Sequence, residues 1–155
     1  MDIGRLYEKL EKHESSQYFD PKLDILYYLS EISEGKRPPC VNAYLAISNW
    51  LAMSRRSGVW TFYEAIEPRQ IQDTVDYLRA KGEIEFAKIL ESGMHDYRNP
   101  VYAENYDYPE EWMEEAEGID TWIREHERWI EVWLEDVLLE NKSMIMELKN
   151  EGNDL

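Results

Sequence analysis

Hydrophobic residues recur along this chain at spacings of three and four positions, and no segment shows the sustained alternation expected of a β-strand. Helices are therefore predicted almost throughout. Asp20-Pro21 is a good N-cap and first-turn pair for the second of them, and we expect that helix to end at Gly35. The first five predicted helices span about residues 3–10, 20–35, 41–56, 67–82 and 83–92.

The segment over residues 41–56 differs from the others because it is apolar or small on nearly every side. A helix that is hydrophobic all round belongs in the middle of a domain. We expect it to end at Ser57-Gly58 and to be followed by an aromatic turn over residues 60–65.

The last third of the chain predicts two more helices. One restarts at Pro109-Glu110-Glu111, and we expect Gly118 to break it. The other is a long Trp-rich helix over about residues 119–141, with its apolar residues on one side and its charged residues on the other. Val132 and Leu139 fall outside that apolar side, so they are either simply exposed or in contact with a second subunit of a homodimer.

Residues 94–109 are the one long irregular stretch of the chain, and they carry Tyr97, Tyr102, Tyr106 and Tyr108. Loops of this length in compact domains usually have a task or are disordered. Tyrosine is a residue type that interfaces favour, so partner contact and structural packing are both open for these side chains. The whole chain, residues 1–155, is expected to form a single all-α domain, a bundle of about seven helices with a frayed end over residues 150–155.

Charge is distributed unevenly along this predicted fold. The chain has 33 acidic and 17 basic residues, a net charge of −16. Residues 104–140 contain 14 of the acids but only Arg124 and Arg128 as bases, together with four of the six tryptophans. A solvated tail would carry the charge without the tryptophans. This part of the sequence therefore indicates a folded acidic surface that also bears aromatic residues.

The net charge restricts the class of partner. Phosphate backbones and anionic membranes are repelled by a strongly negative protein, so direct binding to nucleic acid or to a membrane is disfavoured and a basic protein fits better. Solubility alone is the competing explanation for the charge. No apolar run is long enough to cross a bilayer and the first residues do not open a signal peptide, so we expect a cytoplasmic protein.

Catalytic and metal-binding motifs are absent from the sequence. Cys40 is the only cysteine, which excludes an internal disulfide and a thiolate metal cage. None of the three histidines follows a glutamate at the spacing that di-metal helical bundles use, and no phosphate-binding loop is present, so we expect no cofactor and no metal. His95-Asp96 is the one pair that resembles a catalytic base, whereas His126 is expected to be a core histidine with a hydrogen-bond partner.

Two stretches together resemble a known group. Residues 43–90 run from an apolar helix through Ser57-Gly58-Val59-Trp60-Thr61-Phe62-Tyr63 into two further helices, and Ile119-Asp120-Thr121-Trp122 leads the last long helix. This order is similar to that of the DNA mimic protein 19 family of acidic bacterial proteins, although that family typically has two glycines and a Phe at the break. The resemblance implies a helical, often dimeric protein whose carboxylates occupy the DNA-binding face of a regulator or nucleoid protein.

We therefore expect a non-enzymatic protein that engages a basic, DNA-binding protein through a carboxylate-rich face. Three alternatives stay open: an immunity or antitoxin-like protein that neutralises a basic toxin, a small enzyme using His95 and Asp96, and an acidic helical domain whose charge serves solubility alone. The predicted partner-binding residues are Asp107, Glu110, Glu111, Glu114, Glu115 and Glu117, with Tyr102, Tyr106 and Tyr108.

Overall fold

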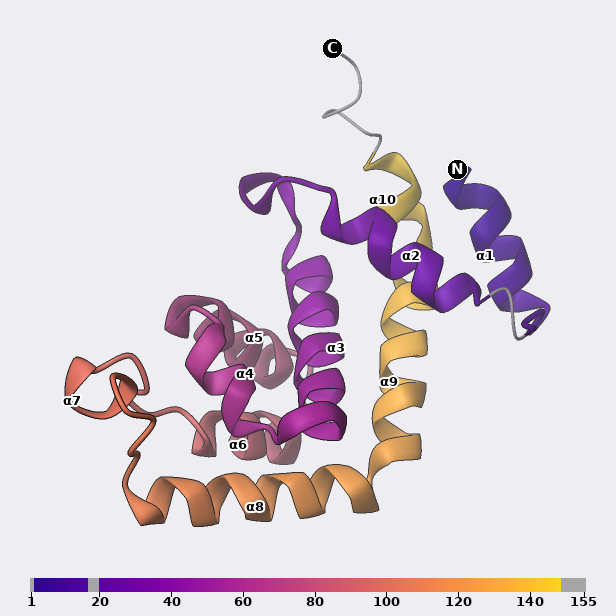
Figure 1. The fold of residues 1–155 in the computed structure, drawn as a ribbon. Helices are drawn as coiled ribbons and strands as arrows, with labels where there is room; N and C mark the ends of the chain where they lie inside the picture. Colours follow the sequence, from indigo (N-terminus) through magenta and orange to yellow (C-terminus); the bar gives the residue numbers. More distant parts are fainter. Residues whose placement is uncertain (1, 17–19, 149–155) are drawn as a thin grey trace.

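The structure is a computed structural model that describes residues 2–16 and 20–148. Within these residues the chain forms ten α-helices, one short 3₁₀ helix and no β-strand, which confirms the all-α fold class (Figure 1). The predicted fraying of residues 150–155 lies outside the described residues. The helices are α1 (Ile3–Glu11), α2 (Pro21–Ser30), η1 (Glu34–Lys36), α3 (Pro39–Ser57), α4 (Trp60–Ala65), α5 (Pro68–Ala80), α6 (Ile84–Ser92), α7 (Pro100–Ala103), α8 (Glu110–Glu125), α9 (Glu127–Glu140) and α10 (Lys142–Glu147).

Helix α2 begins where the sequence predicts but ends earlier. The Asp20 carboxylate accepts a hydrogen bond of 2.9 Å from the backbone N–H of Lys22, as an N-cap should. The helix stops at Ser30 and not at Gly35, which lies in η1. The guanidinium of Arg37 explains the early end, because it donates to the carbonyls of Ser30 and Ile32 and so satisfies the open C-terminus of the helix.

Helix α3 is the centre of the fold, as its apolar sequence predicts. Val41, Ile47 and Trp50 are fully buried in it. Helices α2, α4, α5, α8 and α9 all pack against α3, and Figure 1 shows it enclosed between α4–α6 and α9. The aromatic segment that follows Gly58 is a helix, α4, and its buried Phe62 and Tyr63 extend the core.

The last third of the chain departs from the prediction. Helix α8 continues through Gly118, and a separate helix α9 starts after His126, so the predicted break at Gly118 and the single helix over residues 119–141 are both wrong. Gly118 lies on the outer side of α8 with no atoms near its missing side chain, while Ile119 and Ile123 hold the helix against the core. Figure 1 shows α8 along the base of the molecule and α9 turning away from its end, and His126 is the residue between the two helices.

His126 forms this corner with its hydrogen-bond partner, Trp122. The backbone N–H of His126 donates to the carbonyls of Trp122 and Ile123, which closes α8. Its half-buried ring stacks on the Trp122 indole at 4.1 Å between centroids, with Nδ1 2.8 Å from the Trp122 carbonyl oxygen.

The N-terminal helices are fastened to the end of the described chain. Helix α1 packs against α2 and α10 (Figure 1). The Tyr7 hydroxyl donates to the Leu138 carbonyl at 2.8 Å, and the Tyr28 hydroxyl donates to the Leu148 carbonyl at 2.9 Å. Helix α10, which the sequence analysis did not predict, is therefore part of the packed fold. Among the described residues, every helix is too short or too polar to cross a membrane.

Candidate protein-binding surface

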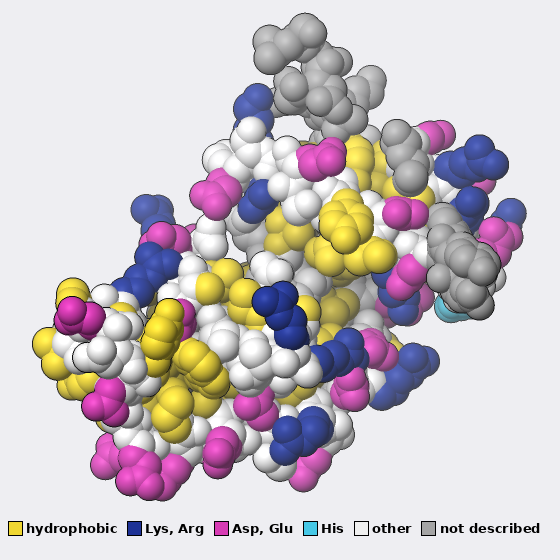
Figure 2. Space-filling view, viewed as in Figure 1, with side chains coloured by type: hydrophobic (Ala, Val, Ile, Leu, Met, Phe, Trp, Pro, Cys, Tyr) yellow, Lys and Arg dark blue, Asp and Glu magenta, His cyan; other side chains and the backbone are white. Residues whose placement is uncertain are grey.

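The first half of α8 displays its carboxylates to solvent. All six predicted acidic residues, from Asp107 to Glu117, are exposed, because the apolar side of α8 faces the core. The sequence contains no Lys or Arg between Arg98 and Arg124. In the part of the chain that the structure describes, the carboxylates of Glu110, Glu111, Glu114 and Glu117 have no hydrogen bond or ion pair. Figure 2 shows acidic side chains gathered along the lower edge of the molecule, over the start of α8.

Glu115 differs from its neighbours because it has a partner. Its carboxylate contacts Nε2 of His95, and the His95 ring stacks on Trp112 at 4.7 Å with an interplanar angle of 7°. Glu115 is therefore held in place by the loop before α8 and is less available to a partner than the carboxylates beside it.

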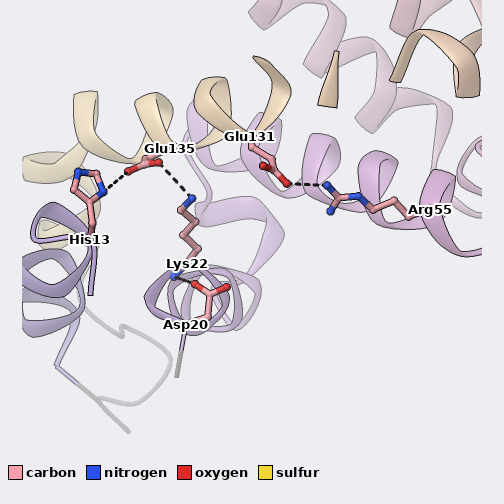
Figure 3. A network of polar contacts seen from close by, with 6 residues as sticks. All are labelled: His13, Asp20, Lys22, Arg55, Glu131 and Glu135. Atoms are coloured by element: carbon pink, nitrogen blue, oxygen red, sulfur yellow. Dashed lines mark hydrogen bonds and ion pairs between the residues drawn. The ribbon is translucent and has the colours of Figure 1, made fainter. Parts of the chain in front are cut away.

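Three of the five carboxylates of α9 are paired within the molecule. Arg55 of α3 contacts both Glu127 and Glu131, the latter at 2.7 Å, and Lys22 of α2 lies 3.3 Å from Glu135 (Figure 3). The acidic block of residues 104–140 thus divides into two groups. One group, on the loop and the first half of α8, has no cationic partner apart from the contact of Glu115 with His95. The other, along α9, is partly compensated, because Arg55 and Lys22 contact three of its carboxylates.

Asp120 lies between these two groups in the sequence, and its carboxylate is also bound within the molecule. Its carboxylate accepts hydrogen bonds from the Ser54 hydroxyl at 2.6 Å and from the Val59 backbone N–H at 2.9 Å. It joins α8 to the end of α3, next to Gly58, whose φ of 99° suits glycine. Asp120 has a structural task and is excluded from the surface.

The tyrosine loop packs around a buried aromatic cluster. Tyr97 is 1% exposed and lies between the rings of Tyr63, Tyr108 and Trp112. Tyr108 is 8% exposed and its hydroxyl donates to the Glu64 carboxylate at 3.0 Å. Burial and this carboxylate raise the pKa of Tyr108 to about 12. The predicted contact residue Tyr108 therefore supports the surface from behind and offers little area to a partner.

The other two predicted tyrosines have different surroundings. Tyr102 is half-buried, with its ring edge-on to Trp112 at 5.1 Å. Tyr106 is 68% exposed and has a φ of 54°, which is unusual for a residue other than glycine. Val101 of the short helix α7 is 76% exposed and was missed by the sequence analysis, where its position in the loop was the only signal.

Together these groups define what we call the acidic surface. This surface combines the exposed carboxylates of the loop and the first half of α8 with two exposed apolar side chains of the same loop, and the buried aromatic cluster joins the two segments. Figure 2 shows hydrophobic side chains beside α7, next to the acidic edge. The members of the acidic surface are Val101, Glu104, Tyr106, Asp107, Glu110, Glu111, Glu114 and Glu117.

The geometry around His95 differs from the catalytic pair that the sequence suggested. Nε2 of His95 contacts Glu115, and among the described residues no hydrogen bond joins its ring to Asp96. Cys40 is buried beside Met144 and burial raises the pKa of its thiol. No cluster of three or more His, Cys, Asp or Glu residues that could hold a metal ion occurs in residues 2–16 and 20–148.

A second row of apolar residues lies on the outer side of α9. Val132 is 40% exposed and Leu139 is 38% exposed, and Trp129 in the same row is 42% exposed. Val132 and Leu139 are the residues that the sequence placed outside the apolar side of the terminal helix. Both side chains are partly exposed to solvent when the chain is considered without a partner.

Comparisons of this chain with protein-family models, with curated proteins and with solved structures found no match. A functional assignment therefore depends on the surfaces described above.

Proposed function

We propose that this chain is a non-enzymatic binding protein whose acidic surface engages a basic, DNA-binding protein in place of DNA. The observation that carries the proposal is the unpaired state of the carboxylates of Glu110, Glu111, Glu114 and Glu117. On α9, by contrast, three carboxylates contact Arg55 or Lys22. A surface that keeps its negative charge uncompensated attracts cationic partners over a distance of about one Debye length, roughly 8 Å at physiological salt.

The spacing of these carboxylates supports imitation of one nucleic-acid strand over a short stretch. Residues 110–117 span roughly 10 Å at a helical rise of about 1.5 Å per residue, so four carboxylates give roughly one charge per 3.5 Å. One strand of B-DNA carries a phosphate about every 3.4 Å. Averaged over residues 104–140 the charge is several-fold sparser than that of a duplex, so the contact would be limited to the first half of α8.

Helix stability accounts for part of this charge but not for all of it. Carboxylates in the first turn complement the helix dipole, and Glu110 and Glu111 lie there. The dipole effect falls off beyond that turn, so Glu114 and Glu117 gain little from it. The exposed Tyr106 and Val101 add contact area that solubility does not require.

The test is capture of partners on the immobilised protein from a lysate of the source organism at low salt, followed by a salt gradient. We expect a basic DNA-binding protein that is released as salt rises and is displaced by added duplex DNA. Replacing Glu111, Glu114 and Glu117 by Gln should weaken its binding at least tenfold, roughly 1.4 kcal/mol. The matched control changes three exposed acids elsewhere, Glu8→Gln, Glu31→Gln and Asp73→Asn, and should bind as the unmodified protein does.

Two results would contradict the proposal. One is a captured partner that duplex DNA does not displace. The other is equal loss of binding in both triple variants, which would show that total charge and not the acidic surface is responsible.

A further inference from the structure

Helix α2 is apolar on two sides. Ile25 and Leu29 face the core and are fully buried, while Leu23 is 46% and Tyr27 is 59% exposed on the outer side. A helix that is apolar all round is normally covered on every side. The outer side of α2 therefore has the composition of a contact surface.

Leu23, together with Leu26 of the same helix, lines a groove between α2, α3 and α9. Its volume is about 270 Å³, and Figure 2 shows hydrophobic side chains over α2 and in the hollow beneath it. Pockets for small molecules usually enclose about 300–1,000 Å³, so this groove suits a few side chains inserted by a protein better than a whole ligand. The apolar walls are formed by Leu23, Leu26, Tyr44, Leu51, Leu134 and Leu138.

Each end of the groove carries more carboxylates than cations. At one end Arg55 is shared by Glu127 and Glu131. At the other Lys22 contacts Glu135, and its backbone N–H is bound by the Asp20 carboxylate (Figure 3). The ring of His13 also lies 3.9 Å from Glu135, and it adds a positive charge only when protonated. A partner with cations at both ends of an apolar row would complement this arrangement.

We propose that this groove binds an amphipathic helix of a partner protein, with apolar side chains between α2 and α9 and a Lys or Arg at each end. Glu131 and Glu135 are four residues apart on α9, so a helix lying along it would meet both with cations spaced three or four residues apart. This inference is independent of the proposed function, because the groove is lined by residues of α2, α3 and α9 and none of α8, and Figure 1 shows α2 far from the start of α8.

Charge decides between this occupant and a second copy of the chain. A second copy has a net charge of −16 and would bring further carboxylates to a groove whose ends already have an excess of them. A basic amphipathic helix removes that excess and covers the apolar wall in the same contact, the helix-in-groove mode of recognition.

The first test uses three synthetic peptides of about four helical turns, labelled for fluorescence anisotropy at physiological salt. One has Leu along one side and Lys on the flanks, the second is a scrambled sequence of the same composition, and the third has Glu in place of Lys. The Leu–Lys helix should bind at least tenfold more tightly than either control. Equal binding of the scrambled peptide would overturn the proposal, because charge alone would then account for the affinity.

The second test changes the groove. Leu23→Ser together with Leu26→Ser should weaken binding of the Leu–Lys peptide at least tenfold, because both side chains line the groove. Leu23→Ser alone, at a side chain 46% exposed, should weaken binding in the same direction with less risk to the fold. The matched control is Ile84→Ser on α6, where the side chain is 60% exposed and binding should not change. The Glu111, Glu114 and Glu117 triple Gln variant should change it less than about threefold, which separates this inference from the acidic surface.

Circular dichroism and thermal melting establish that the variants are folded. Full peptide affinity in the folded Leu23→Ser and double Ser variants would overturn the proposal. So would a dimer in sedimentation velocity that the double Ser variant abolishes, because the occupant would then be a second copy.

Discussion

Tyr63 and Tyr97 stack in the aromatic cluster with centroids 6.3 Å apart, but only one hydroxyl is satisfied. Tyr63 accepts from the Trp50 indole at 3.1 Å and donates to the Leu90 carbonyl at 2.6 Å. The buried Tyr97 hydroxyl has no hydrogen-bond partner among the described residues. A buried hydroxyl contributes to stability only when it is bonded, so the two residues should respond differently to loss of the oxygen.

We predict that Tyr63→Phe lowers the free energy of unfolding by about 1–3 kcal/mol, because it leaves the Trp50 donor unpaired. Tyr97→Phe removes an unpaired group and should leave stability unchanged or raise it by up to about 1 kcal/mol. Urea unfolding followed by tryptophan fluorescence measures both. A Tyr97→Phe variant as unstable as Tyr63→Phe would show that the Tyr97 hydroxyl is bonded after all.

The residue scale also shows which parts of the acidic surface the sequence can predict. Exposure of Glu110, Glu114 and Glu117 follows from the helical period, since the apolar residues of α8 determine its inner side. The loop tyrosines have similar local sequences and different surroundings, because Tyr108 donates to Glu64 from a distant part of the chain while Tyr106 is 68% exposed. Such contacts come from tertiary packing and leave no local signal.

At the scale of the elements, two glycines in helical surroundings should behave in opposite ways. A Cβ on Gly93, at the end of α6, would lie 2.3 Å from the ring of Tyr63, which is fixed by its hydrogen bonds. A Cβ on Gly118, within α8, would meet no atom within 4 Å. One glycine is required by packing, and the other only weakens its helix.

Gly118→Ala should therefore stabilise the protein by about 0.5–1 kcal/mol, the usual gain for alanine over glycine inside a helix. Gly93→Ala should destabilise it by at least about 1–3 kcal/mol, as overpacking does in a filled core. Thermal melting of the two variants compares them directly. If Gly118→Ala lowered the melting temperature, the continuity of α8 through this position would be in question.

Starts of helices were predicted more accurately than their ends. Asp20-Pro21 and Glu67-Pro68 carry local signals, and α2 and α5 begin there. The break at His126 has no such signal, because apolar residues continue at helical spacing from Ile123 to Ile130 across it. Gly118 carries a breaking signal that is overridden by packing of its neighbours. At both positions tertiary contacts determine whether the helix continues. The interruption at His126 is one residue long, so the helical spacing of the apolar residues hardly changes across it.

At the scale of the whole molecule, burial of tyrosine predicts sensitivity to alkali. Burial raises the pKa of Tyr97 to about 12, and it raises the pKa of Tyr7, Tyr44 and Tyr63 further. In the unfolded chain these hydroxyls titrate near pH 10. Between those values the folded state keeps protons that the unfolded state has lost, so the stabilising contribution is complete below about pH 10 and is lost as the pH rises through the folded pKa.

We predict that the free energy of unfolding falls continuously from about pH 10 to about pH 12. Urea titrations at a series of pH values measure this slope. Tyr97→Phe should reduce the slope, because one shifted group is absent, whereas replacing the exposed Tyr106 by Phe should not change it. A stability that is constant up to about pH 12 would contradict the burial of these hydroxyls.

The fastening of α1 and α2 to Leu138 and Leu148 has a consequence for biosynthesis. During translation the residues of α3–α6 emerge as neighbours and can pack on one another at once. Tyr7 and Tyr28 must wait until more than a hundred further residues have been made, since their acceptors lie 131 and 120 positions later. Helix α2 can cover part of α1 as soon as it is made, but the side of α1 that contacts α10 stays uncovered until the last described helices have been synthesised, so the N-terminal helices reach their final packing late.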